Sequence, residues 1–164
     1  MMTTASSSSS TTDSRTLADW EALLPEAPQP VAAYLPAKRA GNLLYTAGVL
    51  PLVNGQLLHT GRVGQEVTLE QATEAARQCV LNALAVAKAE LGSLSRIKNV
   101  VKVVGFVMGT QAFYQHPQVI NGASLALAEI LGDTVGTHAR SAVGVYNLPL
   151  QSPVEIEFIF EVAD

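Results

Sequence analysis

The stretch VEIEFIFEV, residues 154–162, alternates large apolar side chains with mostly acidic ones. Successive side chains of a β-strand point to opposite faces of a sheet, so this alternation predicts a strand with one apolar face and one acidic face. The apolar face needs a helical layer to cover it. The apolar positions are Val154, Ile156, Phe158, Phe160 and Val162, and the acidic ones are Glu155, Glu157 and Glu161.

Two helices are expected to supply that layer. Residues 68–91 carry apolar side chains at the helical period of 3.6, with Thr68 suited to cap the start and Gly92 just past the end. The apolar stripe is rich in alanine, which favours close packing on a sheet. A second helix is expected from about Pro117 to Leu131.

Further strands are predicted around these helices. The pairs Gly41-Asn42 and Asn54-Gly55 can adopt positive φ angles and indicate two short hairpins. The valine-rich run 99–110 predicts a buried strand, and 139–147 predicts another, which we expect to form a final hairpin with the closing strand. The fold class is therefore α+β, with one mixed or mainly antiparallel sheet and two helices on one face.

The length of 164 residues and the 48% hydrophobic content suit one folded domain. Residues 1–15 are rich in Ser and Thr and are expected to form a disordered tail. Residues 16–30 start helically and then break at prolines, which predicts a short N-terminal helix or flap. Residues 31–164 are the expected main domain.

The composition limits which partners and which kinds of site are expected. The net charge of −4 and the lack of a basic run disfavour nucleic acid and anionic membranes as partners, and we expect no membrane span and a cytoplasmic location. Cys79 is the only cysteine and lies on the apolar helical stripe, where we expect it to be buried. No metal is expected, because His59, His116 and His138 lack metal-ligand spacing, and no nucleotide-binding motif is present.

Arg140 is the charge that most needs an explanation. Alternate residues of a strand point to the same face, so Ala142 and Gly144 share a face with Arg140. We expect this to be the face away from the helices. Small side chains there leave room for a pocket. The other interpretation is a structural ion pair between Arg140 and Glu155 or Glu157 across the final hairpin. Both interpretations stay open on the residues alone.

Several blocks of the chain, taken in order, resemble one known family. They are GNLLYTAGVLP (41–51), VTLEQATEAARQCVLNALA, IKNVVKVVGFV, VINGASLAL and ARSAVGVYNLPLQSPVEIEFIF. They resemble the Rid family, also called YjgF/YER057c/UK114 or L-PSP, of reactive imine and enamine deaminases. The resemblance runs from about Val31 to Val162. The added segment LVNGQLLHTGRVG and the form HARSAVG are similar to a longer branch of that family.

This resemblance implies a chorismate-mutase-like sandwich, assembled as a homotrimer with clefts between subunits. It implies hydrolysis of 2-imino or 2-enamino acids, such as 2-aminoacrylate or 2-iminobutanoate, to a 2-ketoacid and ammonia without a cofactor. Arg140 would hold the substrate carboxylate, and Glu155 would orient water and stay ionised beside Arg140. The implied pocket positions are Tyr34, Gly48, Asn121, Ser141 and Ala142, with Asn121 contributed by the neighbouring subunit.

Several positions depart from the family pattern. Ala142 stands where many deaminating members have cysteine, His138 where proline is common, and Ala47-Gly48 where Ser-Gly is usual. These changes leave the preferred substrate open. Two other functions also stay open: a regulatory trimer that binds a small carboxylate without turnover, and an endoribonuclease or translation inhibitor, which the net charge disfavours.

Overall fold

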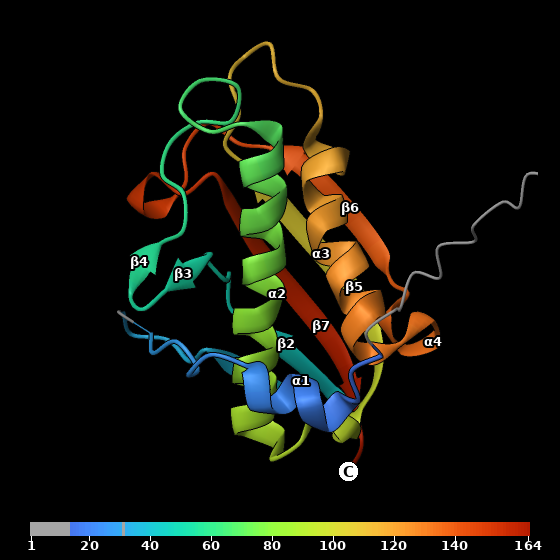
Figure 1. Ribbon diagram of the computed structural model, residues 1–164. Coiled ribbons are helices and arrows are strands. Elements are labelled where there is room, and N and C mark those ends of the chain that lie inside the picture. The colour runs from blue at the N-terminus through green and yellow to red at the C-terminus, as the bar shows by residue number, and fades with distance from the viewer. Residues whose placement is uncertain (1–13, 31) are drawn as a thin grey trace, which may run out of the picture.

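Five strands form one sheet, and the helices gather on one of its faces (Figure 1). The computed structural model describes residues 14–30 and 32–164. Residues 1–13 of the predicted tail, and Val31 at the predicted start of the main domain, lie outside this description. The strands of the sheet are β1 (Ala37–Ala40), β2 (Leu43–Thr46), β5 (Ile97–Val107), β6 (Ala139–Gly144) and β7 (Val154–Val162).

The order of the strands across the sheet is β1-β2-β7-β5-β6. All neighbouring pairs are antiparallel except β5 and β6, which run parallel and are joined by a helical crossover. This confirms the expected mixed sheet and α+β class. The expected final hairpin is wrong, because β5 lies between β6 and β7.

Two long helices cover the sheet, α2 (Leu69–Leu91) and α3 (His116–Leu131). Thr68 and Gln71 form a reciprocal capping box at the start of α2, and Gly92 ends the helix with a φ of 87°. The predicted helix boundaries are thereby confirmed. The shorter elements are α1 (Leu17–Leu23), α4 (Asp133–Gly136), the 3₁₀ turns η1 (Leu94–Arg96) and η2 (Pro149–Gln151), and a separate hairpin of β3 (Leu52–Val53) and β4 (Gln56–Leu57).

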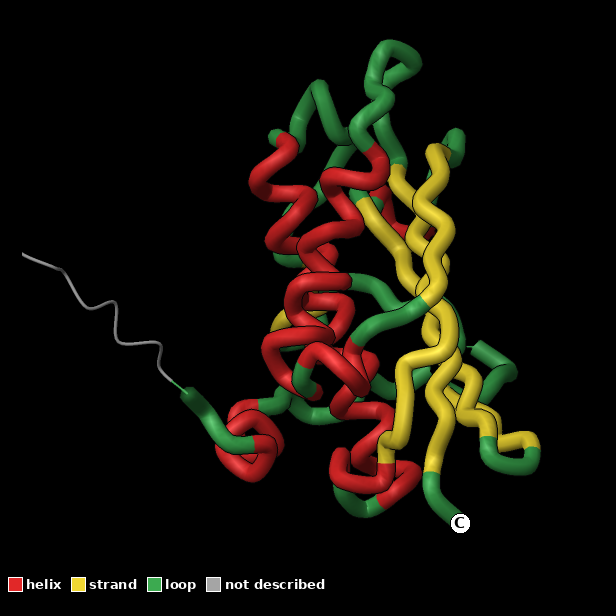
Figure 2. The backbone as a smooth tube through the Cα atoms, turned by 90° about the vertical axis from the view of Figure 1, so that its right-hand side faces the viewer, coloured by secondary structure: helices red, strands yellow, loops and turns green. Residues whose placement is uncertain are grey.

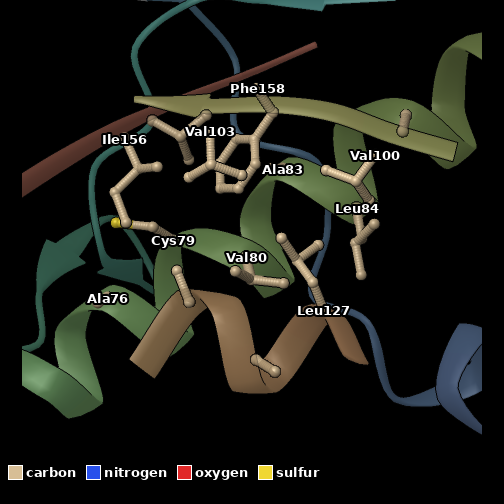
Figure 3. Close-up of a cluster of buried hydrophobic side chains, with 14 of the residues drawn as sticks. Ala76, Cys79, Val80, Ala83, Leu84, Val100, Val103, Leu127, Ile156 and Phe158 are labelled. Carbon is tan, nitrogen blue, oxygen red and sulfur yellow. The ribbon is translucent and has the colours of Figure 1, made fainter. Parts of the chain in front are cut away.

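The two faces of the sheet differ as the alternation in β7 predicted. Figure 2 shows the helices on one side of the strands and no helix on the other. On the covered face, Ile156 and Phe158 pack with Val103 of β5 against α2 and α3 (Figure 3). On the other face, which we call the open face, Glu155 is half-buried and Glu157 is exposed.

Helix α2 packs closely on its neighbours because its apolar stripe is made of small side chains. Cys79 lies within this stripe and is fully buried, as expected, and burial raises the pKa of its thiol well above the ordinary value. Where α2 meets α3, a Cβ at Gly122 would collide with the backbone carbonyl of Thr73. Gly122 therefore sets the distance between the two helices.

Helix α1 lies against the helical layer, and it ends at Leu23 before Pro25, as the sequence predicted. Trp20 is buried, and the Glu21 carboxylate accepts hydrogen bonds from Ser93 Oγ (2.7 Å) and the Leu94 amide (2.6 Å). These contacts fix the start of the N-terminal segment. In the described part of the chain, no helix combines the length and apolar character needed to cross a bilayer.

Candidate functional site

Arg140 lies on β6, the edge strand, and its side chain is on the helix-covered face. In the parallel register with β5, Arg140 is opposite Val103, which is fully buried beneath the helices. Two residues along, Ala142 is opposite Gly105, where a Cβ would collide with Ile120 of α3. The expectation that Arg140 belongs to the open face is therefore wrong, because α3 extends over the edge strand.

Three neutral oxygens on α3 hold the Arg140 guanidinium. Its Nη1 donates to Asn121 Oδ1 (2.8 Å) and Ser124 Oγ (3.1 Å), and its Nη2 donates to the Pro117 carbonyl (3.3 Å). Asn121 and Ser124 are three positions apart, so they lie on one face of the helix. A single helical surface thus fixes the direction of the guanidinium.

The Arg140 charge has no anionic partner among residues 14–30 and 32–164, since no carboxylate oxygen there lies within 4.0 Å of the guanidinium. The proposed ion pair with Glu155 or Glu157 is therefore wrong. A guanidinium has five N–H donors, and three are used here. Two donors and a full positive charge remain, which suits a bidentate carboxylate.

A cavity of about 350 Å³ opens beside Arg140. His138 lines it and contacts Ser124 Oγ through Nε2 (2.9 Å) and the Gly136 carbonyl through Nδ1 (2.6 Å). We call Asn121, Ser124, His138 and Arg140 the arginine group. The sequence did not single out Ser124 or His138 as site residues, although the spacing of Ser124 from Asn121 and of His138 from Arg140 was a usable signal.

The two residues that follow Arg140 do not join this cavity. Ser141 is opposite Val104 in the register with β5, which places it on the open face. Ala142 packs against the hydrophobic core. The structure therefore separates both predicted pocket positions from the guanidinium within one chain.

Glu155 lies on the open face and contacts the backbone of Gly48. A Cβ at Gly48 would collide with the Glu155 carboxylate. The contact is held by two backbone hydrogen bonds between Val49 and Ile156, of 2.8 and 3.1 Å. Desolvation by burial raises the pKa of Glu155, and repulsion from Glu157 raises it further.

Tyr34 and Gly48 both line a small, mainly apolar cavity of about 120 Å³. One wall comes from the N-terminal segment, and the other comes from β-strand connections and α2. We call Tyr34, Gly48 and Glu155 the glutamate group. The full lining is Pro28, Gln29, Pro30, Tyr34, Pro36, Ala47, Gly48, Val49, Leu50, Leu52, Val86 and Leu150.

The arginine group and the glutamate group cannot meet within one chain. Strand β5 separates β6 from β7, which corresponds to about 10 Å between the two strands. Arg140 and Glu155 also lie on opposite faces of the sheet. Within a single chain Arg140 is therefore not a neighbour of Glu155, and the pKa of Glu155 is raised by burial and by Glu157.

Another cavity, of about 610 Å³, lies between loops that include Arg62, Tyr114 and Tyr146. The Arg62 guanidinium donates to the carbonyls of Gly109 (2.9 Å) and Tyr146 (2.8 Å) and to Asn147 Oδ1 (2.9 Å). These bonds hold the loops together. Arg62 therefore has a structural role that Arg140, held by one helix at an open edge, does not have.

Comparisons with known proteins identify relatives of this chain. Residues 13–162 match the family model described as "YjgF/chorismate mutase-like, putative endoribonuclease". Protein TCP17 of Trypanosoma cruzi is 37% identical over 139 residues, which cover 85% of this chain and 87% of that protein. The crystal structure of a putative endoribonuclease from Shewanella oneidensis superimposes with a TM-score of 0.85 at 32% identity, covering 90% of this chain and all of that one. A shorter match joins 43 residues, 25% of this chain, to 34% of the 3-aminoacrylate deaminase RutC of Acinetobacter baylyi, at 46% identity.

Proposed function

The chain belongs to the YjgF/chorismate mutase-like family, and on that premise we propose that it hydrolyses 2-imino acids and their enamine tautomers to 2-ketoacids and ammonia. One observation carries the proposal: Arg140 presents an unneutralised charge and two unused donors beside a cavity. The short match to a 3-aminoacrylate deaminase supports the same substrate class. The predicted cytoplasmic location stays part of this proposal.

The proposed site is composite, with the arginine group of one copy facing the glutamate group of another. Among the residues that the structure describes, each group lacks what the other has, since Arg140 has no anionic partner and Glu155 has no cationic one. The open face also offers apolar side chains to a second copy, since Val143 is 44% exposed and Phe106 and Ile159 are only partly buried. We propose a homotrimer, as the family resemblance implies.

In this site the substrate carboxylate binds the two unused donors of Arg140, while Asn121 and Ser124 fix the guanidinium. Glu155 of the second copy accepts a proton from water as the water oxygen bonds to the C=N carbon and the C=N π electrons move to nitrogen, and the protonated Glu155 then gives this proton to that nitrogen. The resulting carbinolamine then loses ammonia, and its hydroxyl oxygen becomes the ketone of the product. Holding water and imine together supplies much of the acceleration.

Within one chain burial raises the pKa of Glu155, which favours a proton acceptor because a general base is most effective when its pKa approaches the working pH, whereas Arg140 of a second copy acts in the opposite direction. Gly48 also helps to position the Glu155 carboxylate, because a Cβ at this position would collide with it. Tyr34 stands 50% exposed at the edge of the neighbouring apolar cavity. We assign that cavity to the apolar part of the substrate.

The test is 2-ketoacid release from imines generated in situ by a threonine dehydratase. Wild-type protein should accelerate release, Arg140→Ala should not, and Arg39→Ala should behave as wild type. Arg39 is a matched control because it is also an arginine on an edge strand, and within the described part of the chain it contacts backbone carbonyls and Asp164. Equal rates with and without wild-type protein would overturn the proposal.

The second candidate is a regulatory protein that binds a small carboxylate without turnover. It is favoured by the completeness of the arginine group within one chain, whereas Glu155 lies on the other face. Calorimetric binding of 2-oxobutanoate that depends on Arg140, together with no ketoacid release, would support it. The endoribonuclease activity named in the family description ranks below both, because the chain carries a net charge of −4.

A further inference from the structure

We propose that His138, acting through Ser124, makes carboxylate binding at Arg140 depend on the protonation of the His138 ring. This inference rests on the proposed function, since it concerns the same anion site. His138 is a positioning residue in this account, because it contacts Ser124 and not the reacting atoms. The consequence is a site that binds its anion more tightly as the pH falls.

The geometry fixes which ring nitrogen changes. Nδ1 of His138 lies 2.6 Å from the Gly136 carbonyl, which can only accept a hydrogen bond, so Nδ1 carries a hydrogen in both protonation states. Nε2 lies 2.9 Å from Ser124 Oγ. Any change of protonation therefore occurs at Nε2 and reaches Ser124 directly.

The hydroxyl of Ser124 has a different direction in each state. When the ring is neutral, Nε2 accepts the Ser124 hydrogen, and the Ser124 oxygen accepts from Arg140 Nη1. When the ring is protonated, Nε2 donates, and Ser124 Oγ then accepts from both His138 and Arg140. The Ser124 hydrogen must then point away from both, and the cavity that Ser124 lines offers it room.

Protonation thus changes the anion site in two ways that act together. It frees a hydroxyl donor that can turn toward an anion in the cavity. It also places a second positive charge one hydroxyl away from the Arg140 guanidinium. Both effects strengthen the binding of a carboxylate at low pH.

Other charged groups near this cavity are directed elsewhere. Among the described residues that line it, only His138 and Arg140 are titratable. Glu129 of α3 pairs with Arg77 at 2.6 Å, and Lys102 of β5 lines a separate pocket on the open face. On α4, Asp133 is exposed and is not among the residues that line the cavity.

The protonation of Glu155 has to be excluded as a second cause of pH dependence. Under the proposed function, Glu155 of a second copy faces the same anion, and its own protonation would also favour binding at low pH. The experiment therefore uses the full-length Glu155→Gln protein. The probe is 2-oxobutanoate, whose carboxylate stays ionised throughout the range in which histidine titrates, about pH 5 to about pH 8.

Calorimetry should show about fivefold tighter binding of 2-oxobutanoate at about pH 5 than at about pH 8. In Glu155→Gln/His138→Gln, which has a neutral amide in place of the ring, the two affinities should agree within about twofold. An equal response to pH in both proteins would overturn the role of His138 while leaving the carboxylate site intact. If no binding occurs at either pH, both this inference and the proposed function are wrong.

A second measurement keeps the proposal testable if His138→Gln does not fold. In the Glu155→Gln protein at a fixed pH near neutrality, NMR should show that saturating 2-oxobutanoate increases the protonated fraction of His138, because linkage is reciprocal. An unchanged ring signal in the presence of bound ligand would contradict the coupling.

Discussion

The arginine group and the glutamate group are built in opposite ways. Arg140 lies at the sheet edge on the helix-covered face, with its direction fixed by three neutral oxygens of α3. Glu155 lies on the open face, half-buried against the Gly48 backbone and beside the like charge of Glu157. Arg140 is thus positioned without a counter-charge among the described residues, whereas Glu155 is partly desolvated and lies against the Gly48 backbone.

Under the proposed function, this difference requires two copies of the chain at each site. A fixed cation binds an anion but cannot activate water, and a carboxylate of raised pKa can accept a proton but cannot hold an anionic substrate. Two faces of one sheet cannot bring these functions together. A second copy of the chain can.

The largest effect is expected from breaking the arginine group. Arg140→Ala should lower kcat/KM for 2-iminobutanoate by about a thousandfold, because a bidentate charge-assisted contact to the carboxylate is lost. Arg140→Lys should recover only a small part, since an ammonium cannot reproduce the paired geometry. Steady-state kinetics on folded variants measures both. Full activity in Arg140→Lys would show that charge alone suffices.

Breaking the glutamate group should affect turnover more than binding. Glu155→Gln is expected to lower kcat by about a few hundredfold and leave KM nearly unchanged, because the amide cannot accept the proton from water. In the wild type, activity needs ionised Glu155, so kcat falls as the pH drops through the raised pKa of this group, at higher pH than for an ordinary glutamate. A pH profile in which Glu155→Gln keeps that acid limb would assign the limb to another group.

A smaller loss is expected when the glutamate is displaced but not removed. Gly48→Ala should lower kcat by about thirtyfold, since the new methyl group pushes the carboxylate away from its position and small displacements of reacting groups are costly. The melting temperature should change little, because the displaced group is the end of a flexible side chain. A normal kcat in Gly48→Ala would show that this contact does not position Glu155.

The smallest effect is expected from removing the negative charge of Glu157 beside Glu155. Glu157→Gln removes the like charge that raises the pKa of Glu155, so the acid limb of the pH profile should move to lower pH. The rate near neutral pH should change by less than about twofold, because Glu157 is exposed. An acid limb that stays in place would leave burial as the only cause of the raised pKa.

The parts of this molecule that could be predicted from sequence are those set by neighbouring residues. The alternation of β7 and the caps of α2 each depend on residues within one element, and both agree with the structure. The parallel pairing of β5 with β6 could not be predicted in this way, because it joins segments separated by a whole helix. The predicted hairpin of the last two strands is wrong for that reason, because β5 lies between them.

The predicted placement of Arg140 on the open face is wrong for a related reason. Strand β6 is built mainly of small side chains and is at most partly buried along its length, so its composition does not distinguish a covered face from an open one. Only the position of α3 over the edge strand determines which face of β6 is covered. The contact between Ser124 and His138 likewise depends on tertiary structure, although each residue lies close in sequence to a predicted site residue.

The most direct test of the account is subunit mixing. Arg140→Ala and Glu155→Gln proteins, each inactive alone, should regain activity when they are unfolded together and refolded at equal amounts. Random assembly places an intact arginine group against an intact glutamate group in about a quarter of the sites, so about a quarter of wild-type activity is expected. A mixture that assembles but stays as inactive as its components would contradict the composite site.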